Sequence, residues 1–190
     1  MARIPYAEIE NAPEKIRDFF VKMGANDVEI LNIFRMIAHS DISVREFIRL
    51  GSRLLVKPHL DPRFRELAIL RIAQMNQARY EWTHHIPIAV GVGITPEQIK
   101  QLKNWQESPL FTDRDKTVLG FTEELVRDGH PTDETFAAAA AFLEPASLVE
   151  LTLSIGYWSM VAKFLNTFQV DIEEDFKQKH AKILADIGSL

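Results

Sequence analysis

Three features of this 190-residue chain predict a single all-α domain. Apolar residues recur at helical spacing through nearly every segment. Ser, Thr or Asp precedes many of these segments, and proline often follows at the first helical position. No stretch rich in glycine, proline or serine divides the chain, whose length suits one domain with a sizeable core. We therefore expect one helical domain over residues 1–190, with an N-terminal arm of two or three helices packed on it.

The first half of the chain carries clear helix start signals. Ser43 with Glu46 matches a capping box, which predicts a helix beginning just after residue 43. Asp61-Pro62 predicts the start of a helix over 62–75, in which Leu67 and Leu70 contribute to apolar faces.

A short turn near Asn76-Gln77 separates that helix from a second one over 78–90. Gly91 ends the second helix, because glycine commonly follows the last helical residue. Pro87 inside it has no N–H to donate to the carbonyl of Thr83, so we expect a kink or a distorted turn there.

Capping boxes also mark two later helices. Thr95-Pro96 with Gln98 opens one, and Thr112 with Asp115 opens the other. Further helices are expected over 113–127, 132–142, 145–167 and 173–187. The segment 145–167 is apolar almost all round and rich in β-branched and aromatic residues, so a strand competes there. Its length favours a central helix. The amphipathic segment 173–187 is expected to dock on the domain or on another subunit.

Composition excludes several functions. The net charge is −5 and no basic run is present, which argues against nucleic acid as a partner. No segment resembles a signal peptide or is expected to span a membrane, so a cytoplasmic location is the default. The chain has no cysteine, which excludes disulfides, thiolate catalysis and Cys-ligated metal sites.

One group of ionisable residues points to chemistry. A short connection makes the helices 62–75 and 78–90 antiparallel neighbours, which brings Glu66 to the level of His85. Glu81 precedes His84 by three residues and His85 by four, so either histidine can share its face. A carboxylate that orients an imidazole is a general acid/base arrangement.

Two other interpretations of this group stay open. On spacing alone, a surface pair of Glu81 with His84 and a hydrogen-bonded core histidine at His85 explain the pattern more simply. The Glu-x-x-His step from Glu81 to His84 also occurs in di-iron bundles, but those bundles use it twice, and it occurs once here. A mononuclear metal site from Glu66, Glu81 and a histidine remains a third possibility.

The stretch around these residues resembles the carboxymuconolactone decarboxylase family, which includes the alkylhydroperoxidase D-like (AhpD-like) proteins. The resemblance is dense over residues 61–103, which contain RELAILRIAQMNQARYEWTHHIPIAVGVGITPEQIKQL, and extends to ELTLSIGYWSMVAKFLN nearer the C-terminus. It implies an AhpD-like helical bundle that assembles as a homotrimer or homohexamer.

In the peroxidase branch, a glutamate is followed by Cys-x-x-Cys and then by a histidine. This pattern places the glutamate on Glu66, the two cysteines on Ala78 and Glu81, and the histidine on His85. Both redox positions are lost, so the residues do not support a label of peroxidase or peroxiredoxin, because the nucleophile must be a thiolate.

The decarboxylase branch works without a metal or an organic cofactor, and its namesake reaction is a lactone decarboxylation. The resemblance therefore implies a lyase acting on a small carboxylic acid, with His85 as proton donor and Glu66 holding its tautomer. Glu81 would act as a second acid or orient the substrate. His84 and Trp82 are candidates for substrate binding.

An anionic substrate would also need a cation to offset two glutamates, and Arg71 is one candidate, although a salt bridge is its simpler role. The alternatives are a non-catalytic small-molecule-binding or scaffold protein, and a metal-dependent enzyme using Glu66, Glu81 and a histidine.

Overall fold

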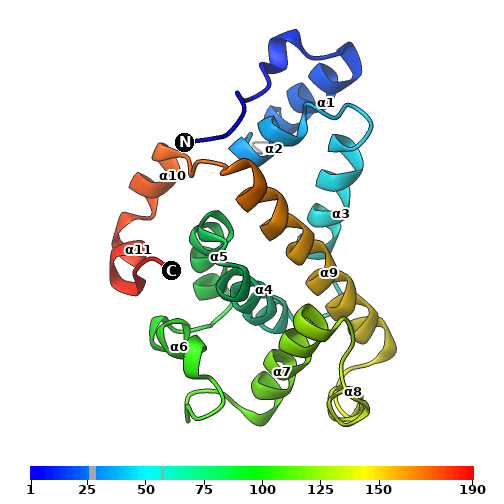
Figure 1. The fold of residues 1–190 in the computed structure, drawn as a ribbon, viewed down its shortest axis with the longest axis vertical. Coiled ribbons are helices and arrows are strands. Elements are labelled where there is room, and N and C mark those ends of the chain that lie inside the picture. Colours follow the sequence, from blue (N-terminus) through cyan, green and yellow to red (C-terminus); the bar gives the residue numbers. More distant parts are fainter. Residues whose placement is uncertain (26–28, 57) are drawn as a thin grey trace.

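The computed structural model describes residues 1–25, 29–56 and 58–190, and every regular element in those ranges is a helix (Figure 1). The predicted all-α fold is therefore confirmed. The α-helices are α1 (Glu14–Gly24), α2 (Asn32–Ile37), α3 (Val44–Val56), α4 (Pro62–Asn76), α5 (Arg79–Gly91), α6 (Pro96–Gln101), α7 (Asp113–Asp128), α8 (Asp133–Ala140), α9 (Pro145–Phe168), α10 (Glu174–Lys179) and α11 (Ala181–Ile187).

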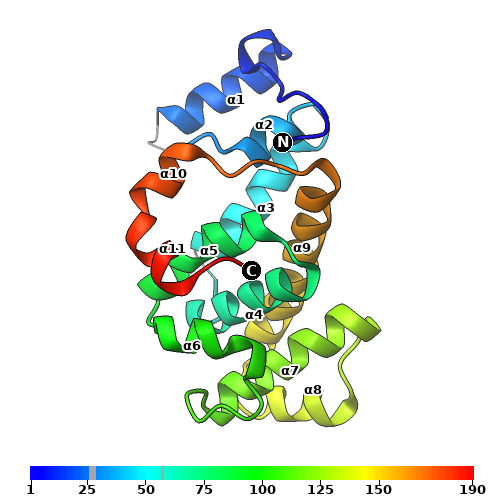
Figure 2. The same cartoon turned by 60° about the vertical axis from the view of Figure 1, so that its left-hand side comes forward.

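Helix α4 is the centre of the fold. It packs against α5, α7 and α9, and nearly all its side chains between Arg65 and Ala73 are buried. Helices α1, α2 and α3 lie at one end of the molecule and α7 and α8 at the other (Figures 1 and 2). The N-terminal helices form the predicted arm. It has a small apolar cluster of its own, joined to the main core through Phe34, Phe47 and Phe164.

Local capping explains where several helices begin. The Asp61 carboxylate accepts a hydrogen bond from the Arg63 N–H at the start of α4. The capping boxes predicted at Thr95 and Thr112 are both present. Ser43 precedes the first residue of α3 as expected, and its hydroxyl accepts a hydrogen bond from the Ser40 hydroxyl.

The connection between α4 and α5 places the face of α4 that carries Glu66 beside the face of α5 that carries His85. Gln77 takes a left-handed conformation with φ of 53°, which ends α4 and reverses the chain within two residues. Helix α5 then runs to Gly91 with Pro87 inside it, so the proline does not end the helix.

Helix α9 confirms the helical interpretation of its segment over the strand. It is long and apolar enough to cross a membrane by length and composition alone, contrary to our expectation that no segment would be. It packs against α3, α4, α5, α7 and α8, however, and the central helix of a water-soluble core meets the same criteria.

The predicted C-terminal helix over 173–187 is instead two short helices, α10 and α11, which meet at His180. Helix α11 packs on α5 and α6 of the same chain. Figure 2 shows this segment running alongside α5.

Candidate active site

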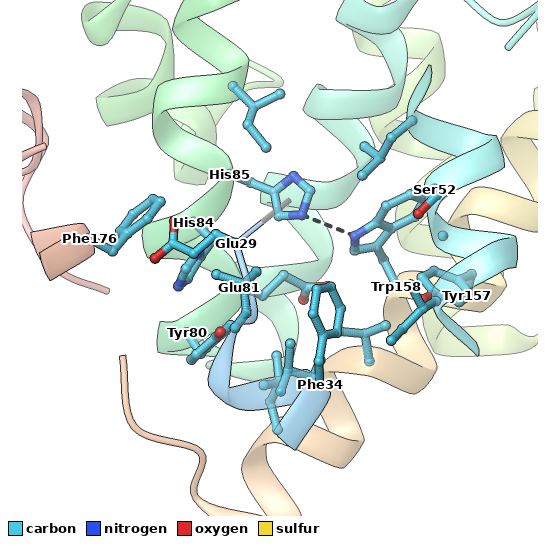
Figure 3. Close-up of a pocket in the computed structure, with 18 of the residues that line it drawn as sticks. Glu29, Phe34, Ser52, Tyr80, Glu81, His84, His85, Tyr157, Trp158 and Phe176 are labelled. Atoms are coloured by element: carbon cyan, nitrogen blue, oxygen red, sulfur yellow. Dashed lines mark hydrogen bonds between the residues drawn. The ribbon is translucent and has the colours of Figure 1, made fainter. Parts of the chain in front are cut away.

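A cavity of 540 Å³ lies between α3, α5, α9 and α10, close to the start of α2. That volume is typical of small-molecule sites. The side chains that carry its chemistry come mostly from α5, and the aromatic walls come from α2, α3, α9 and α10 (Figure 3). The α5 residues around this cavity include Glu81, His84 and His85, three of the residues singled out in the sequence.

The predicted meeting of α4 and α5 produces a buried carboxylate–imidazole pair. His85 Nδ1 lies 2.7 Å from Glu66 Oε2, and the Glu66 side chain is fully buried. Arg65 Nε donates to the other carboxylate oxygen of Glu66 at 2.9 Å. The Arg65 guanidinium also donates to the carbonyls of Leu54 and Leu55 at the end of α3. Arg65 therefore supplies the positive charge that a buried Glu66 carboxylate requires.

Trp158 fixes the tautomer of His85. The indole Nε1–H donates to His85 Nε2 at 3.1 Å, as the dashed line in Figure 3 shows. Because an N–H donor faces Nε2, that nitrogen must be the unprotonated acceptor. The ring proton then sits on Nδ1, where it is donated to Glu66. This contact geometry defines His85 as a neutral imidazole with its lone pair on Nε2.

Glu81 is the unusual carboxyl of the site. Its side chain is 2% exposed, and neither carboxyl oxygen has a hydrogen-bond partner among the described residues. Burial, with a smaller contribution from the negative charge of Glu66, raises the pKa of Glu81 well above 4.5. Both effects favour the neutral carboxylic acid, which has a proton to donate into the cavity.

His84 belongs to a second carboxylate. Its Nε2 lies 2.8 Å from Glu173 Oε2, and the Tyr80 hydroxyl donates to Oε1 of the same carboxylate at 2.7 Å. Burial opposes ionisation of Glu173, but hydrogen bonds from His84, from the Asn32 backbone N–H and from Tyr80 outweigh it and lower its pKa. The His84 ring stacks between those of Tyr80 and Phe176. The sequence left open which histidine faces the cavity, and in the structure both line it.

Two residues predicted to contact substrate lie outside the cavity. Trp82 is on the opposite side of α5, where its indole N–H donates to the carbonyl of Gly188 in the C-terminal segment. Arg71 forms an ion pair with Glu123 of α7 and a hydrogen bond with Gln74. Packing and a salt bridge, the simpler roles weighed for these residues, account for both.

The sequence reasoning missed several residues of the site. Trp158 and Tyr157 lie on α9, which is apolar on nearly every face, so no periodicity in the sequence separates its cavity side. Glu173 begins the amphipathic segment 173–187, for which the sequence predicts docking alone. The sequence feature that could have identified Glu173 as a site residue is its position directly before the amphipathic helix that carries Phe176.

The ionisable side chains around the cavity are glutamates, histidines and tyrosines. Among the described lining residues the ionisable side chains other than tyrosine are Glu29, Glu81, His84, His85 and His180, with no lysine or arginine. Within the described ranges no three His, Cys, Asp or Glu side chains gather in a way that could hold a metal ion. The Glu66–Glu81–histidine metal site considered from the sequence therefore gains no support from the geometry.

Residues 44–124 match the model of the carboxymuconolactone decarboxylase family. This match contains the whole segment over which the sequence resembles the family, residues 61–103. The matched region contains α4, α5 and the Glu66–His85 pair. The chain is also 28% identical over 114 residues to the uncharacterized protein YnjA of Escherichia coli, a match that covers 58% of this chain and 62% of YnjA.

Solved structures of similar fold support the AhpD-like architecture. An uncharacterized peroxidase-related protein with an alkylhydroperoxidase AhpD core, from Ralstonia eutropha, superposes with a TM-score of 0.79 at 18% identity, covering 100% of this chain and 98% of that one. A variant of the debrominase Bmp8 in complex with 2,3,4-tribromopyrrole has a TM-score of 0.75 at 14% identity, covering 96% of this chain and 100% of that one. These likenesses establish the fold.

Proposed function

We propose that this protein is an enzyme that transfers protons to and from a small ring-containing molecule by acid/base chemistry, without a thiol. The observation that carries this proposal is Glu81, a buried and unpartnered carboxylic acid that faces a cavity beside the Glu66–His85 pair. Unpartnered buried carboxyls are costly to folding, and they concentrate at functional sites.

We assign different roles to the two groups. Glu81 is the acid, because burial keeps its proton in place and leaves it without an internal acceptor. His85 is the base, because its unprotonated Nε2 is held in position by Glu66 through Nδ1. This reverses the role expected for His85, which carries no proton on Nε2 in this tautomer. An acid and a base on one cavity can remove a proton beside a substrate carbonyl while the carbonyl oxygen is neutralised.

Lactone decarboxylation is the narrowest form of the proposal, and it is the namesake reaction of the family. Loss of CO₂ breaks a C–C bond, leaves the electron pair in the ring as an enolate, and requires one proton, which Glu81 would supply. The Bmp8 complex with a brominated pyrrole supports a ring-shaped substrate more generally. We propose that the protein acts in the cytoplasm as a homotrimer or homohexamer.

Hydrogen–deuterium exchange into a panel of cyclic lactones and enones, γ-carboxymuconolactone included, tests the proposal by NMR in D₂O. The same spectra follow decarboxylation of the carboxymuconolactone. The wild type is expected to accelerate exchange or decarboxylation of at least one panel member. Glu81→Gln and His85→Ala each lower that rate by about 10²–10⁴-fold, the usual contribution of a general acid or base. Glu66→Gln lowers it as well.

The matched control is Glu97→Gln, an exposed glutamate on α6 that does not line the cavity. It should leave the rate unchanged. Equal rates in wild type, Glu81→Gln and His85→Ala would refute the assigned roles.

A non-catalytic binding protein is the second candidate, and one observation favours it. Both ring nitrogens of His85 already have partners, so a ligand must displace the Trp158 N–H before His85 can act as a base. A molecule that binds in the cavity with no exchange, decarboxylation or other turnover across the panel would establish this candidate.

A further inference from the structure

We propose that the cavity selects an uncharged, flat ring system that carries a carbonyl or similar hydrogen-bond acceptor, and that it excludes the carboxylate of the same shape. This inference rests on the proposed proton transfer and names the substrate class of the same site. It counts against lactone decarboxylation, whose substrate is a carboxylate, and it replaces the small carboxylic acid expected from the sequence. It rests on the shape of the cavity, on its charges, and on which hydrogen-bond donors are already used.

The walls of the cavity are suited to flat rings. Phe47 and Tyr157 lie with ring centroids 5.2 Å apart, and Tyr157 and Trp158 lie 5.0 Å apart nearly edge to face. Phe34 of α2 and Phe176 of α10 also line the cavity (Figure 3). A dry cavity of roughly 150 Å³ already holds benzene. A volume of 540 Å³ therefore has room for two fused rings with a substituent.

The charges of the cavity disfavour anions. The described lining contains no lysine or arginine, and its two acidic side chains, Glu29 and the neutral Glu81, offer no positive charge to an anion. His84 bonds the Glu173 carboxylate, and His85 bonds Glu66, so neither is a free cation. At His180, burial and then the nearby Lys179 charge lower the pKa, which favours the neutral ring. A carboxylate brought here would lose its hydration without gaining a counter-ion.

Most donors facing the cavity are already committed. The Tyr157 hydroxyl donates to the carbonyl of Phe47, the Tyr80 hydroxyl donates to Glu173, and the Trp158 N–H donates to His85. The neutral Glu81 carboxyl has no partner among the described residues. Glu81 can donate one hydrogen bond to an acceptor on the ligand, and this bond satisfies a buried group that otherwise has none.

The test uses two ligands of the same shape, naphthalene-2-carboxamide and 2-naphthoate, measured by isothermal titration calorimetry with the full chain at pH 7. The uncharged carboxamide is expected to bind at least about tenfold more tightly than the anionic carboxylate, since a buried unpaired charge costs more than that factor. Tighter or equal binding of 2-naphthoate, or binding of neither ligand, would overturn the inference.

Substitutions at Glu81 separate hydrogen bonding from charge. Glu81→Gln keeps a donor of the same size, so carboxamide affinity should stay within about threefold of wild type and 2-naphthoate should remain weak. Glu81→Leu removes the donor and should weaken the carboxamide at least about tenfold. A large gain in 2-naphthoate affinity in Glu81→Gln would contradict a neutral Glu81. Glu97→Gln is the control, and thermal melting verifies that each variant is folded.

These measurements do not depend on turnover. Selective binding of the carboxamide with no proton exchange in any ring compound would refute the proposed enzyme and leave this inference standing. Proton exchange by the wild type together with preferred binding of 2-naphthoate would do the reverse.

Discussion

The Glu81 carboxyl is buried near Glu66, and this burial makes the stability of the protein depend on pH. Its raised pKa means that the folded chain holds this proton above pH 4.5, where the unfolded chain has lost it. The contribution of Glu81 to stability is therefore fully present below about pH 4.5 and declines as pH rises toward the pKa of the folded state.

We expect Glu81→Gln to remove this decline, because glutamine does not titrate. Urea unfolding of the variant and the wild type at several pH values from 4.5 upward gives the difference in their unfolding free energies at each pH. This difference should change as pH rises. A difference that is constant with pH would show that Glu81 titrates normally in the folded protein.

The Arg65–Glu66 ion pair gives a second prediction. Both side chains are buried, and Arg65 provides the charge that balances Glu66. Arg65→Met should destabilise the protein by about 3–5 kcal/mol, because it leaves a buried carboxylate without its cation. Denaturant unfolding of this variant beside Arg53→Met, an exposed arginine on α3, measures the difference. Adding Glu66→Leu should recover part of the loss, and a further loss would contradict the assignment.

At the level of single residues, the sequence was most informative where spacing and resemblance agreed. The α4–α5 turn and the positions of Glu66 and His85 predicted a pairing that the structure contains at 2.7 Å. The partner of the other ring nitrogen, Trp158, is 73 residues farther along the chain. No local pattern predicts a contact at that separation, because it depends on how α9 rotates against α5.

Among the elements, α4 should contribute most to the core. Leu70 is fully buried where α4 meets its neighbours, so Leu70→Ala should cost about 2–5 kcal/mol of stability. Leu50→Ala on α3 is the same chemical change at an exposed position, and its cost should be below about 1 kcal/mol. Chemical denaturation of both variants checks the ranking, and equal losses would show that α4 is not the central packing element.

Helix positions were predictable where capping or proline chemistry marked them. The starts of α4, α6 and α7 follow from Asp61, Thr95 and Thr112, whose side chains accept from the first turn. The break at His180 was not predictable, because the amphipathic pattern continues across it while the backbone leaves the helical conformation. Trp82 and Arg71 take the simpler of the roles weighed for them, packing and a salt bridge, because both faces of α4 and α5 are covered by other helices.

The whole molecule exposes an apolar face that bears on assembly. Val149, Leu153 and Met160 project from one side of α9 and are 47–58% exposed. If the expected trimer or hexamer forms through this face, Leu153→Glu should shift the protein toward smaller species in analytical ultracentrifugation. Ile42→Glu, an apolar residue 84% exposed between α2 and α3, should leave the sedimentation coefficient unchanged. A wild-type monomer would refute the assembly proposal.

The C-terminal segment forms one side of the cavity although little of it is buried. Helices α10 and α11 contain no fully buried side chain, yet Phe176 and His180 form part of the cavity wall. Their attachment depends on a few contacts, such as Glu173 with His84 and Lys100 with Asp186. Such a segment opens locally many times before the domain unfolds. We therefore expect a bound molecule that contacts Phe176 to slow this local opening, which hydrogen exchange of the α10 amides with and without the ligand would measure.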